Sequence, residues 1–316
     1  SKPTTIKPVK VLEAYEGPEA SVSAVEYQNG SRAVIIDGFM ATSQTSPGNE
    51  WITEHYMAWM GHLPMLLHPN PKNALVICFG TGQTANAVRR ENPESLDIVD
   101  INPRIFLLAD NFLSNENVLD DPRVKTITMD GRAYIRRTGK KYDVITLEPM
   151  PPSFAGVNAL YSARFYELAR ENMTDEGIIA QWLPFHLVGA EFSASISKTF
   201  QSVFPNSALW IDPESGTGIL LGSKNDQGNL GAEWPGLSRN SIKRTLEENK
   251  IRDSLVLNRS DLLRYTEQAT IITDDNQLLA YGRAVGMMHN FDNLEEENIK
   301  MMETINPKVR QIYQSE

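Results

Sequence analysis

Two polar segments, each following an apolar run, carry residue types suited to binding a nucleoside. Gly80-Thr81-Gly82 opens a helix-like stretch, and its small residues would let a ligand approach the backbone closely. Asp100 ends the next apolar run, where a carboxylate can accept hydrogen bonds from both hydroxyls of a ribose. Together they predict a site for a nucleoside-containing cofactor. The alternative is a structural glycine turn beside a solvated aspartate.

Two more acids end the following apolar runs. Asp130, which precedes Gly131, could accept a hydrogen bond from an adenine amino group, or could simply belong to a turn. Glu148 precedes a loop at 149–152 in which three of four residues are proline, so that loop has a set shape. We expect Glu148 to contact cofactor or substrate, or to act as a base. The alternative is a carboxylate that caps the helix expected near residue 162.

The tail of the chain contains an acidic pair, Asp274 and Asp275, in the sequence IITDDN at 271–276. If this segment folds back over the pocket, both acids would attract a cation, with Asp274 as a candidate catalytic residue and Asp275 as a substrate contact. The alternative is an Asx or N-cap turn that begins a helix at Gln277.

The end of the fifth apolar run would border a pocket for an acceptor. Gln181 and Trp182 are candidate substrate contacts there, and His186, just beyond, is a candidate catalytic residue. The alternatives are core packing for Trp182 and a partly buried loop position for His186. Cys78 lies on the first apolar run and is expected to be a small buried hydrophobe. The single cysteine and five histidines have no ligand spacing, so no metal site is expected.

The elements that would position these residues follow from the apolar pattern. Buried parallel strands are predicted at 74–79, 96–101, 124–129, 142–147 and 177–183, with crossover helices at 83–91, 103–114, 131–138, 162–173 and 189–203. This alternation specifies an α/β fold with a doubly wound sheet. An antiparallel hairpin over 207–211 and 218–223 is expected to close the sheet.

The chain is predicted to consist of three regions, and the sheet forms the middle one. Residues 1–68 are predicted to form a small β unit, with a hairpin turn at Asn29-Gly30, and a connecting helix over 50–67. Residues 69–225 form the predicted cofactor-binding domain. Residues 226–316 are predicted to be a helical extension, with apolar periodicity over 237–265 and 277–313.

Composition limits the kind of ligand. The 316 residues include 30 Lys and Arg against 40 Asp and Glu, for a net charge of −10. Because binding to nucleic acid draws its affinity from clustered basic residues, a nucleic-acid partner is not expected, and a small cationic or neutral substrate fits better. No apolar stretch is long enough to span a bilayer or resembles a secretory signal. The chain begins at Ser1 without Met, which is expected of a protein whose upstream segment has been removed.

Several segments together resemble the spermidine/spermine synthase family, and more closely the spermidine-synthase-like domains that are often fused behind membrane-spanning segments. They are GTG at 80–82, VDIN at 99–102, MDGR at 129–132, YDVITLEP at 142–149, FAGVNALYSARFYE at 154–167 and QWL at 181–183. TDDN at 273–276 resembles a motif of that branch. The similarity covers about residues 20–225.

The resemblance implies a class I methyltransferase-like, or Rossmann-like, sheet that binds S-adenosylmethionine or its decarboxylated form, without a metal. Asp100 would hold the ribose and Asp130 the adenine amino group. Glu148 and the turns that contain Thr81 and Gly131 would complete the cofactor site. The resemblance further implies a homodimer. It also implies a cytoplasmic location, either as a free protein or as the cytoplasmic domain of a protein with a membrane-spanning segment upstream.

The sequence departs from that family where the family binds and deprotonates a diamine. An acid of the glycine-rich turn is replaced by Thr81, and the position of the family's base is occupied by Pro151. Tyr56 is retained as a substrate contact, but the Gln that follows it in the family falls on Met57, and the loop 212–218 lacks a substrate-binding Tyr. Glu148 is therefore the best remaining candidate for the base. Intact S-adenosylmethionine is expected to bind at least as well as the decarboxylated form.

These observations predict an enzyme that moves a carbon group from a sulfonium donor to a small nucleophile, such as an amine. One alternative is a methyltransferase, and another is a self-reaction of the donor in a lyase or cyclase. A third is an NAD-dependent oxidoreductase, which shares the glycine turn, and the last is a non-catalytic nucleoside-binding domain.

Overall fold

The computed structural model describes residues 8–45, 56–152, 154, 156–239, 248–280 and 293–313. An eight-stranded sheet forms its centre, in the order β12-β10-β11-β9-β8-β5-β6-β7. Its parallel part contains β5 (Asn73–Ile77), β6 (Ser95–Asp100), β7 (Val124–Thr128), β8 (Tyr142–Leu147) and β9 (Met173–Leu183). The antiparallel part contains β10 (Asn206–Ile211), β11 (Gly218–Ser223) and β12 (Leu255–Leu257). The predicted strands and the closing hairpin are confirmed.

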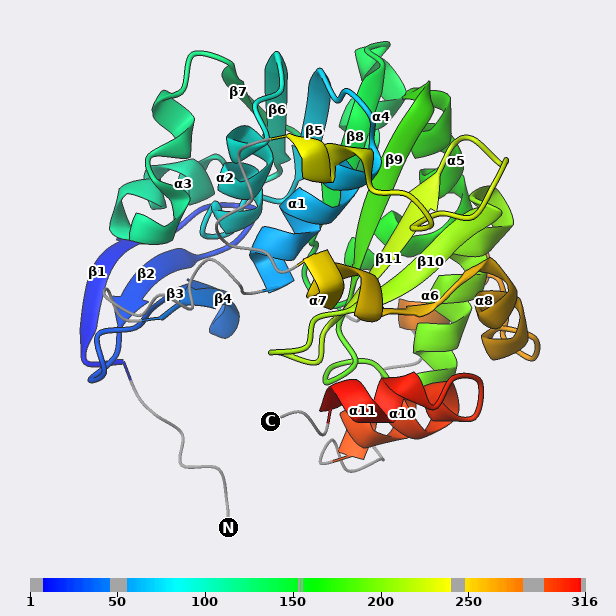
Figure 1. Ribbon diagram of the computed structural model, residues 1–316. Helices are drawn as coiled ribbons and strands as arrows, with labels where there is room; N and C mark the ends of the chain where they lie inside the picture. Colours follow the sequence, from blue (N-terminus) through cyan, green and yellow to red (C-terminus); the bar gives the residue numbers. More distant parts are fainter. Residues whose placement is uncertain are drawn as a thin grey trace.

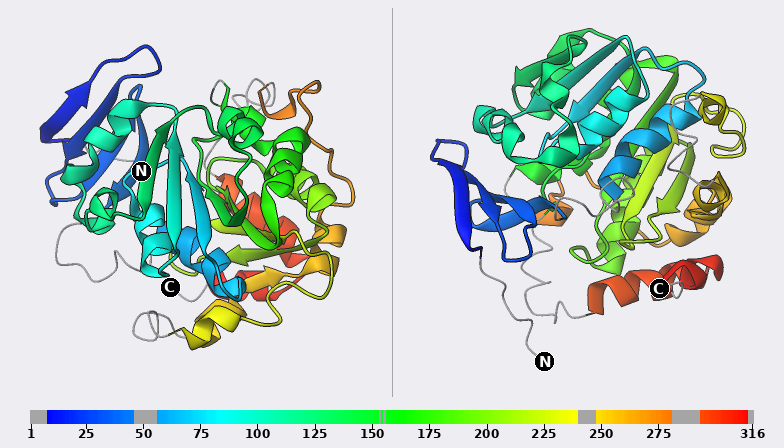
Figure 2. Two further views of the ribbon diagram at one scale, coloured as in Figure 1. Left: turned by 90° about the horizontal axis from the view of Figure 1, so that it is seen from above. Right: turned by 60° about the vertical axis from the view of Figure 1, so that its left-hand side comes forward.

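Helices cover both faces of this sheet (Figures 1 and 2). Apolar residues of α4 (Gly131–Thr138), α5 (Ala163–Glu171) and α6 (Ala190–Val203) share one buried cluster with the sheet. On the opposite face lie α1 (Tyr56–Leu67) and α2 (Gln83–Arg90), whose apolar residues pack with sheet residues in two further clusters. Since successive strand residues point to opposite faces, Ala74 and Val76 contact the α2 side while Leu75 and Ile77 contact the other.

The N-terminal segment forms a separate antiparallel sheet of β1 (Lys10–Tyr15), β2 (Val22–Glu26), β3 (Arg32–Ile36) and β4 (Phe39–Gln44). The turn at Asn29-Gly30 joins β2 and β3, as predicted, with Gly30 at a φ of 78°. Figure 1 shows this sheet beside α3 (Pro103–Leu107), at one end of the large sheet. Val22, Ala24 and Val34 pack into the same cluster as α2, so the small sheet is docked onto the α/β domain.

The prediction of one continuous helix over 103–114 is wrong. The helix α3 ends at Leu107, and the chain continues as the 3-10 turns η2 (Ala109–Asn111) and η3 (Leu113–Asn115). Asn115 is buried, and its side-chain amide donates to the carbonyls of Thr81 (3.1 Å) and Ala109 (2.8 Å). These bonds fix the chain beside the glycine turn in a path that a continuous helix does not follow.

The tail is also not helical throughout. Leu255–Leu257 adds strand β12 to the sheet edge, between α7 (Glu248–Asp253) and α8 (Arg259–Tyr265). The helices α10 (Leu294–Glu303) and α11 (Lys308–Tyr313) pack below α6, as Figure 1 shows. Residues 271–273 are part of neither a helix nor a strand. Residues 50–55, the predicted start of the connecting helix, lie outside the described residues, as do residues 281–292.

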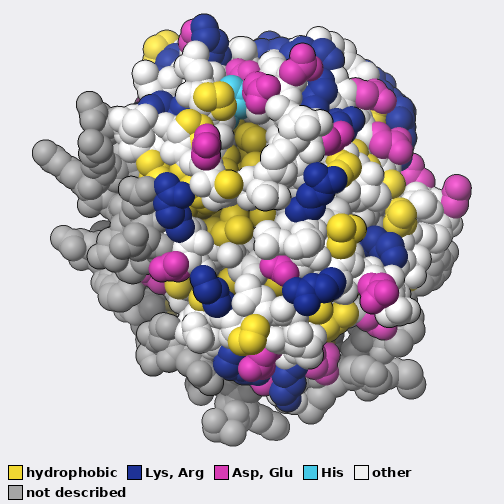
Figure 3. Space-filling view, turned by 45° about the vertical axis from the view of Figure 1, so that its right-hand side comes forward, with side chains coloured by type: hydrophobic (Ala, Val, Ile, Leu, Met, Phe, Trp, Pro, Cys, Tyr) yellow, Lys and Arg dark blue, Asp and Glu magenta, His cyan; other side chains and the backbone are white. Residues whose placement is uncertain are grey.

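Charged side chains of both signs are interspersed on the face shown in Figure 3, without a patch of one sign. Within the described ranges, no helix combines the length and the apolar character needed to cross a membrane.

Candidate functional site

A cavity of about 360 Å³ lies at the carboxyl ends of β5, β6 and β8. Its walls also include Gly131 at the start of α4, Met57 from α1 and four residues of the small sheet and its last turn, which are Ile36, Asp37, Ala41 and Thr42. Loops that follow parallel strands converge at this edge of an open α/β sheet, which is where such folds bind ligands. The sequence-predicted acids Asp100, Asp130 and Glu148 all line this cavity.

The glycine turn places the start of α2 against the cavity. Gly82 is the N-cap of α2 and has a φ of 84°. A Cβ at this position would lie 2.7 Å from the ring of Phe79, so only glycine fits both the backbone and the packing. The first amide groups of a helix lack intrahelical partners, and those of α2 begin at a residue that lines the cavity.

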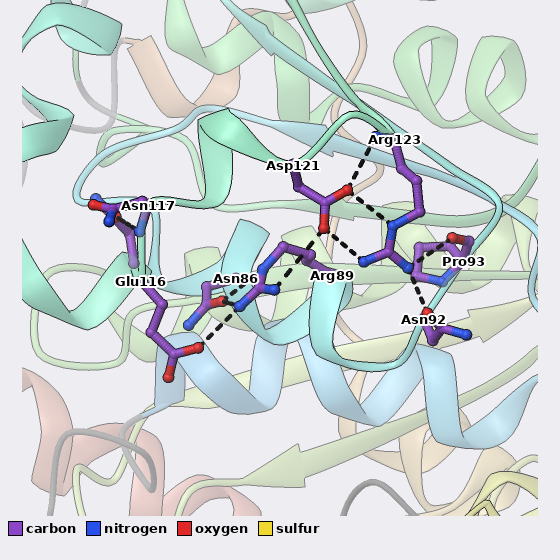
Figure 4. A network of polar contacts seen from close by, with 9 residues as sticks. Asn86, Arg89, Asn92, Pro93, Glu116, Asn117, Asp121 and Arg123 are labelled. Atoms are coloured by element: carbon purple, nitrogen blue, oxygen red, sulfur yellow. Dashed lines mark hydrogen bonds and ion pairs between the residues drawn. The ribbon is translucent and has the colours of Figure 1, made fainter.

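The other end of α2 is fixed by a polar network (Figure 4). Arg89 donates to Asn86 (2.7 Å) and Glu116 (2.9 Å) and lies 3.9 Å from Asp121. Arg123 also pairs with Asp121 (2.6 Å), and these arginines hold the pKa of that carboxyl well below its usual range. The network ties α2 to the loops beside it and so holds its first turn in place.

Asp100 already accepts backbone hydrogen bonds on both of its oxygens. The amides of Phe79 (2.9 Å) and Asn102 (3.0 Å) donate to it. Burial nevertheless raises the pKa of Asp100. A carboxylate has about four lone-pair sites, so this geometry orients the group and leaves acceptor capacity for ligand hydroxyls. Ile101 beside it lines the cavity and is 55% exposed, which leaves an apolar surface for a ring.

Asp130 is the N-cap of α4, where one carboxylate oxygen accepts from the amide of Ala133 (2.8 Å). It is exposed and lines the cavity. The turn interpretation of this residue is therefore correct, and the residue is also part of the cavity lining.

Glu148 lies at the opposite side of the cavity, directly after β8. Its two oxygens accept hydrogen bonds from the hydroxyls of Tyr56 (2.7 Å) and Thr84 (3.3 Å). Burial raises the pKa of Glu148 to about 7, although both hydrogen bonds favour the ionised form. Tyr56 is stacked on Trp182, with ring centroids 6.2 Å apart. Glu148 can thus exchange a proton near neutral pH.

The hydroxyl of Thr84 has one proton but two acceptors within reach. It lies 2.9 Å from the carbonyl of Met57 and 3.3 Å from Glu148. If the proton goes to the closer carbonyl, the Thr84 oxygen can accept from a protonated Glu148. These contacts therefore accommodate Glu148 in its neutral form as well as its ionised form.

Next to Glu148, one wall is polar but uncharged. The sulfur of Met57 accepts from Thr42 Oγ1 (3.1 Å) and Gln83 Nε2 (3.3 Å), and Gln83 also donates to Thr81 Oγ1 (3.0 Å). The sequence pointed to Thr81 and Met57 as departures. It gave no signal for Thr42, which reaches the cavity from β4 of the small sheet.

Charge on the lining has one sign. Among the described residues that line the cavity, five are acids and none is Lys, Arg or His; the acids are Glu19, Asp37, Asp100, Asp130 and Glu148. Glu19 and Asp37 come from the N-terminal segment and were missed, because only the docking of the small sheet brings them here. A cavity of this kind attracts cations. Pro151 also lines it, so the loop lies where predicted and carries no acid at that position.

The structure does not bring all candidates to the cavity. Gln181 points to the α5 face of β9 and accepts from Tyr166 OH (3.2 Å), whereas its neighbour Trp182 points to the cavity face. His186 is exposed in the turn after β9 and is not part of the lining.

The acidic pair of the tail is also outside the lining. Asp274 forms a two-pronged ion pair with Arg132 of α4, and Asp275 is exposed in the same turn. Thr273 and Asn276 exchange side-chain hydrogen bonds across this turn, each 3.1 Å long. The turn alternative is therefore the one that the structure adopts. Catalytic roles for Asp274 and His186 stay predictions without a contact to the cavity.

The sequence predicts Cys78 on the strand, but β5 ends at Ile77, and Cys78 follows it with a φ of 73°, a left-handed conformation. Cys78 is part of the cavity lining and also packs against the buried cluster that the sheet shares with α4, α5 and α6, so the prediction of a small buried hydrophobe is correct in part. It is half-buried, and burial raises the pKa of its thiol well above the usual range, so it is not poised as a nucleophile. No group of three or more metal-binding side chains occurs within the described part of the chain.

The model of the spermine/spermidine synthase domain matches residues 53–213. A polyamine aminopropyltransferase of Methanocaldococcus jannaschii is 29% identical over 162 residues, which are 51% of this chain and 53% of that relative. One of Bacillus subtilis is 26% identical over 208 residues, 65% of this chain and 73% of the relative. The aligned part thus spans about half of the first relative's length.

Solved structures share the fold. A spermidine synthase from Thermotoga maritima superposes with a TM-score of 0.64 at 19% identity, covering 80% of this chain and 86% of that one. A spermidine synthase in complex with the transition-state analogue AdoDATO gives 0.62 at 19% identity, with the same coverage. The predicted methyltransferase-like α/β fold is confirmed.

Proposed function

This chain belongs to the spermine/spermidine synthase family, and from that premise we propose that it is a transferase acting on an adenosyl sulfonium in the acidic cavity. The donor is S-adenosylmethionine or its decarboxylated form, and the acceptor is a small nucleophile such as an amine. The observation that carries the proposal is the five acids of the lining, with no basic side chain among the described lining residues. Such a lining favours a cation and opposes a dinucleotide with its diphosphate, so it argues against the NAD-dependent alternative.

In this proposal the acids at the strand ends divide the donor between them. Asp100 accepts from the ribose hydroxyls, and the exposed side chain of Ile101 packs on the adenine ring. Asp130 accepts from the adenine amino group. The sulfonium then lies toward Glu148, across the cavity.

Glu148 is the proposed base. A sulfonium close to it stabilises the carboxylate and lowers its pKa from about 7, so that donor binding prepares the base. Only an uncharged amine has a lone pair for attack. As the new nitrogen–carbon bond forms, the carbon–sulfur bond breaks, its electron pair neutralises the sulfonium to a thioether, and the amine proton passes to Glu148.

The uncharged wall supports intact S-adenosylmethionine as a donor. Thr81, Gln83 and Thr42 offer hydroxyl and amide groups, which neither repel a carboxylate nor hold a lone ammonium as an acid would. The start of α2 adds backbone amides, which suit a carboxylate. We propose that the intact donor binds at least as well as the decarboxylated one. The homodimer implied by the family resemblance stays a prediction.

Product analysis tests the proposal. The protein is incubated with each donor, with and without a series of diamines. Methylthioadenosine that forms only with an amine supports transfer of the carbon arm. S-adenosylhomocysteine instead identifies a methyltransferase, and methylthioadenosine without any acceptor identifies a self-reaction. Tight donor binding without any product contradicts the assignment as an enzyme.

A further inference from the structure

The turn at residues 273–276, which contains Asp274, does not line the cavity but contacts Arg132, the residue directly after two lining residues. Asp274 accepts from both terminal nitrogens of Arg132, with Nη1 to Oδ1 at 2.7 Å. Arg132 directly follows Gly131 and Asp130, which both line the cavity. A basic side chain therefore starts at the rim of an acidic cavity and is directed onto an acid of the tail, 142 positions away in sequence.

The turn is held in place by contacts other than this ion pair. The carbonyl of Ile272 accepts from the amide of Ala163 (2.9 Å), and its own amide donates to Thr199 Oγ1 (2.8 Å). Asn158 donates to Gln277 (2.7 Å), and Ile272 is only 2% exposed. Loss of the Asp274 charge therefore removes the ion pair but leaves the docking of the turn.

Asp130 attracts the same guanidinium. The pKa of Arg132 is raised first by its hydrogen bonds to Asp274 and then, in smaller part, by the charges of Asp274 and Asp130. Without the charge of Asp274, Asp130 still attracts Arg132, and Asp130 lines the cavity. A guanidinium that pairs with Asp130 would cancel one of the five lining charges and repel a bound cation. Arg104, near the other end of the lining, is likewise directed away, over the ring of Tyr15 at 5.3 Å.

We propose that Asp274 is a specificity-determining residue that acts through Arg132: by pairing with this arginine, it keeps a positive charge out of the donor cavity. The inference rests on the proposed function, because it concerns preference for a cationic ligand. It also gives the TDDN segment at 273–276 a role that does not require contact with substrate.

The test compares two ligands that differ by a methyl group and the sulfonium charge, S-adenosylmethionine and S-adenosylhomocysteine. Their dissociation constants are measured by calorimetry at pH 8 and low salt, and their ratio reports charge preference. Asp274→Asn is expected to reduce the preference for the sulfonium about threefold to tenfold. Arg132→Met should keep or increase it, and the double variant should resemble Arg132→Met, because the released charge is then absent.

A matched control is Asp226→Asn. Asp226 pairs with Arg170 at 3.0 Å and has a side-chain exposure of 45%, against 42% for Asp274, but it lies outside the lining of the cavity. Its ratio should stay within about twofold of the wild type. Asp274→Glu keeps the charge and should restore the wild-type ratio, which also covers the case of an unstable Asp274→Asn protein.

Three results overturn the inference. One is an unchanged ratio in Asp274→Asn, and another is an equal loss of both ligands, which shows a structural role. The third is a double variant as impaired as Asp274→Asn. Wild-type protein that binds neither ligand overturns the proposed function itself, so the two failures are distinguishable.

Discussion

Strands β6 and β8 each carry a buried acid near the start and another at or just beyond the carboxyl end, and the two ends differ in their partners. On β6, Asp97 accepts from Tyr142 OH (2.6 Å) and Lys140 Nζ (2.9 Å). Burial alone would raise the pKa of Asp97, but these groups lower it overall. At the end of the same strand, Asp100 has only backbone donors, and burial raises its pKa.

The same contrast holds on β8. Asp143 accepts from the amides of Lys72 (2.8 Å) and Asn73 (2.9 Å) and from Thr174 (2.8 Å). Burial opposes ionisation there too, yet these donors lower the pKa of Asp143 overall. Glu148, just past the strand, has two hydroxyl donors and a pKa of about 7. An acid satisfied by the fold stabilises the fold, whereas an acid that remains under-compensated at a cavity favours a cationic ligand.

The largest expected effect is on catalysis by Glu148. Glu148→Gln keeps the size of the side chain and one acceptor oxygen, but it replaces the other oxygen by an amide nitrogen that donates, and it cannot accept a proton. With whichever diamine supports turnover, kcat should fall about a hundredfold or more. Glu94→Gln, which alters a 68% exposed acid paired with Lys72, is the control and should leave kcat unchanged. Equal turnover in Glu148→Gln and wild type would remove Glu148 from the mechanism.

A second substitution adds an acid to the uncharged wall. Two unit charges about 4 Å apart interact by roughly 4 kcal/mol at an effective dielectric constant of 20, which bounds the effect near a thousandfold. Thr81→Asp should therefore shift the affinity ratio toward decarboxylated S-adenosylmethionine by about a hundredfold, since it repels the carboxylate of the intact donor and attracts the lone ammonium. The measurement is calorimetry with both donors. Wild-type protein that already strongly prefers the decarboxylated donor contradicts the role given to Thr81.

Stability should respond in the opposite sense at the two ends of β8. Asp143→Ala leaves two backbone amides without their acceptor, so the free energy of unfolding should fall by about 2–3 kcal/mol. Glu148→Gln removes a buried carboxyl that resists ionisation, and should leave stability at pH 8 equal or slightly higher. Urea denaturation of both variants measures the difference. A larger loss in Glu148→Gln would make Glu148 a structural acid like Asp143.

The smallest effect is a pH dependence of unfolding. Because burial raises the folded-state pKa of Glu148 from its ordinary value of 4.5 to about 7, the folded protein binds more protons than the unfolded chain across that range. Stability from this group is thus greatest at low pH and falls as pH rises from about 4.5 to 7. Asp212, with a pKa raised by burial to about 6, acts in the same direction up to that pH.

Burial lowers the pKa of His68 and His186, and these groups act in the opposite direction near pH 6. Between pH 6 and 7, the melting temperature of the wild type should therefore fall by about 2 °C relative to that of Glu148→Gln. Curves that stay parallel over this interval would show that Glu148 does not titrate there.

The sequence predicted the acids at the strand ends better than it predicted the directions of neighbouring side chains. Asp100, Asp130 and Glu148 could be placed because each ends an apolar run, and parallel strands bring their carboxyl ends to one edge. The sequence could not show which of Gln181 and Trp182 faces the cavity, because a continuously apolar strand does not reveal which side each residue faces. The structure places them on opposite faces.

Local sequence patterns could not identify the residues and contacts that come from outside the parallel sheet. Glu19, Asp37 and Thr42 reach the cavity only because the N-terminal sheet docks beside α2. The ion pair of Asp274 with Arg132 joins residues far apart in sequence, and the short strand β12 has only three residues, too few for a clear periodicity.

Proton release on donor binding tests the central claim most directly. Wild type and Glu148→Gln are titrated with S-adenosylmethionine at pH 7 by calorimetry in buffers of different ionisation enthalpy. If the sulfonium lies beside Glu148, the wild type should release about half a proton more than the variant, because a group with a pKa of about 7 is half protonated at this pH. Equal release from both proteins, or equal release with S-adenosylhomocysteine, would contradict a cation held beside Glu148.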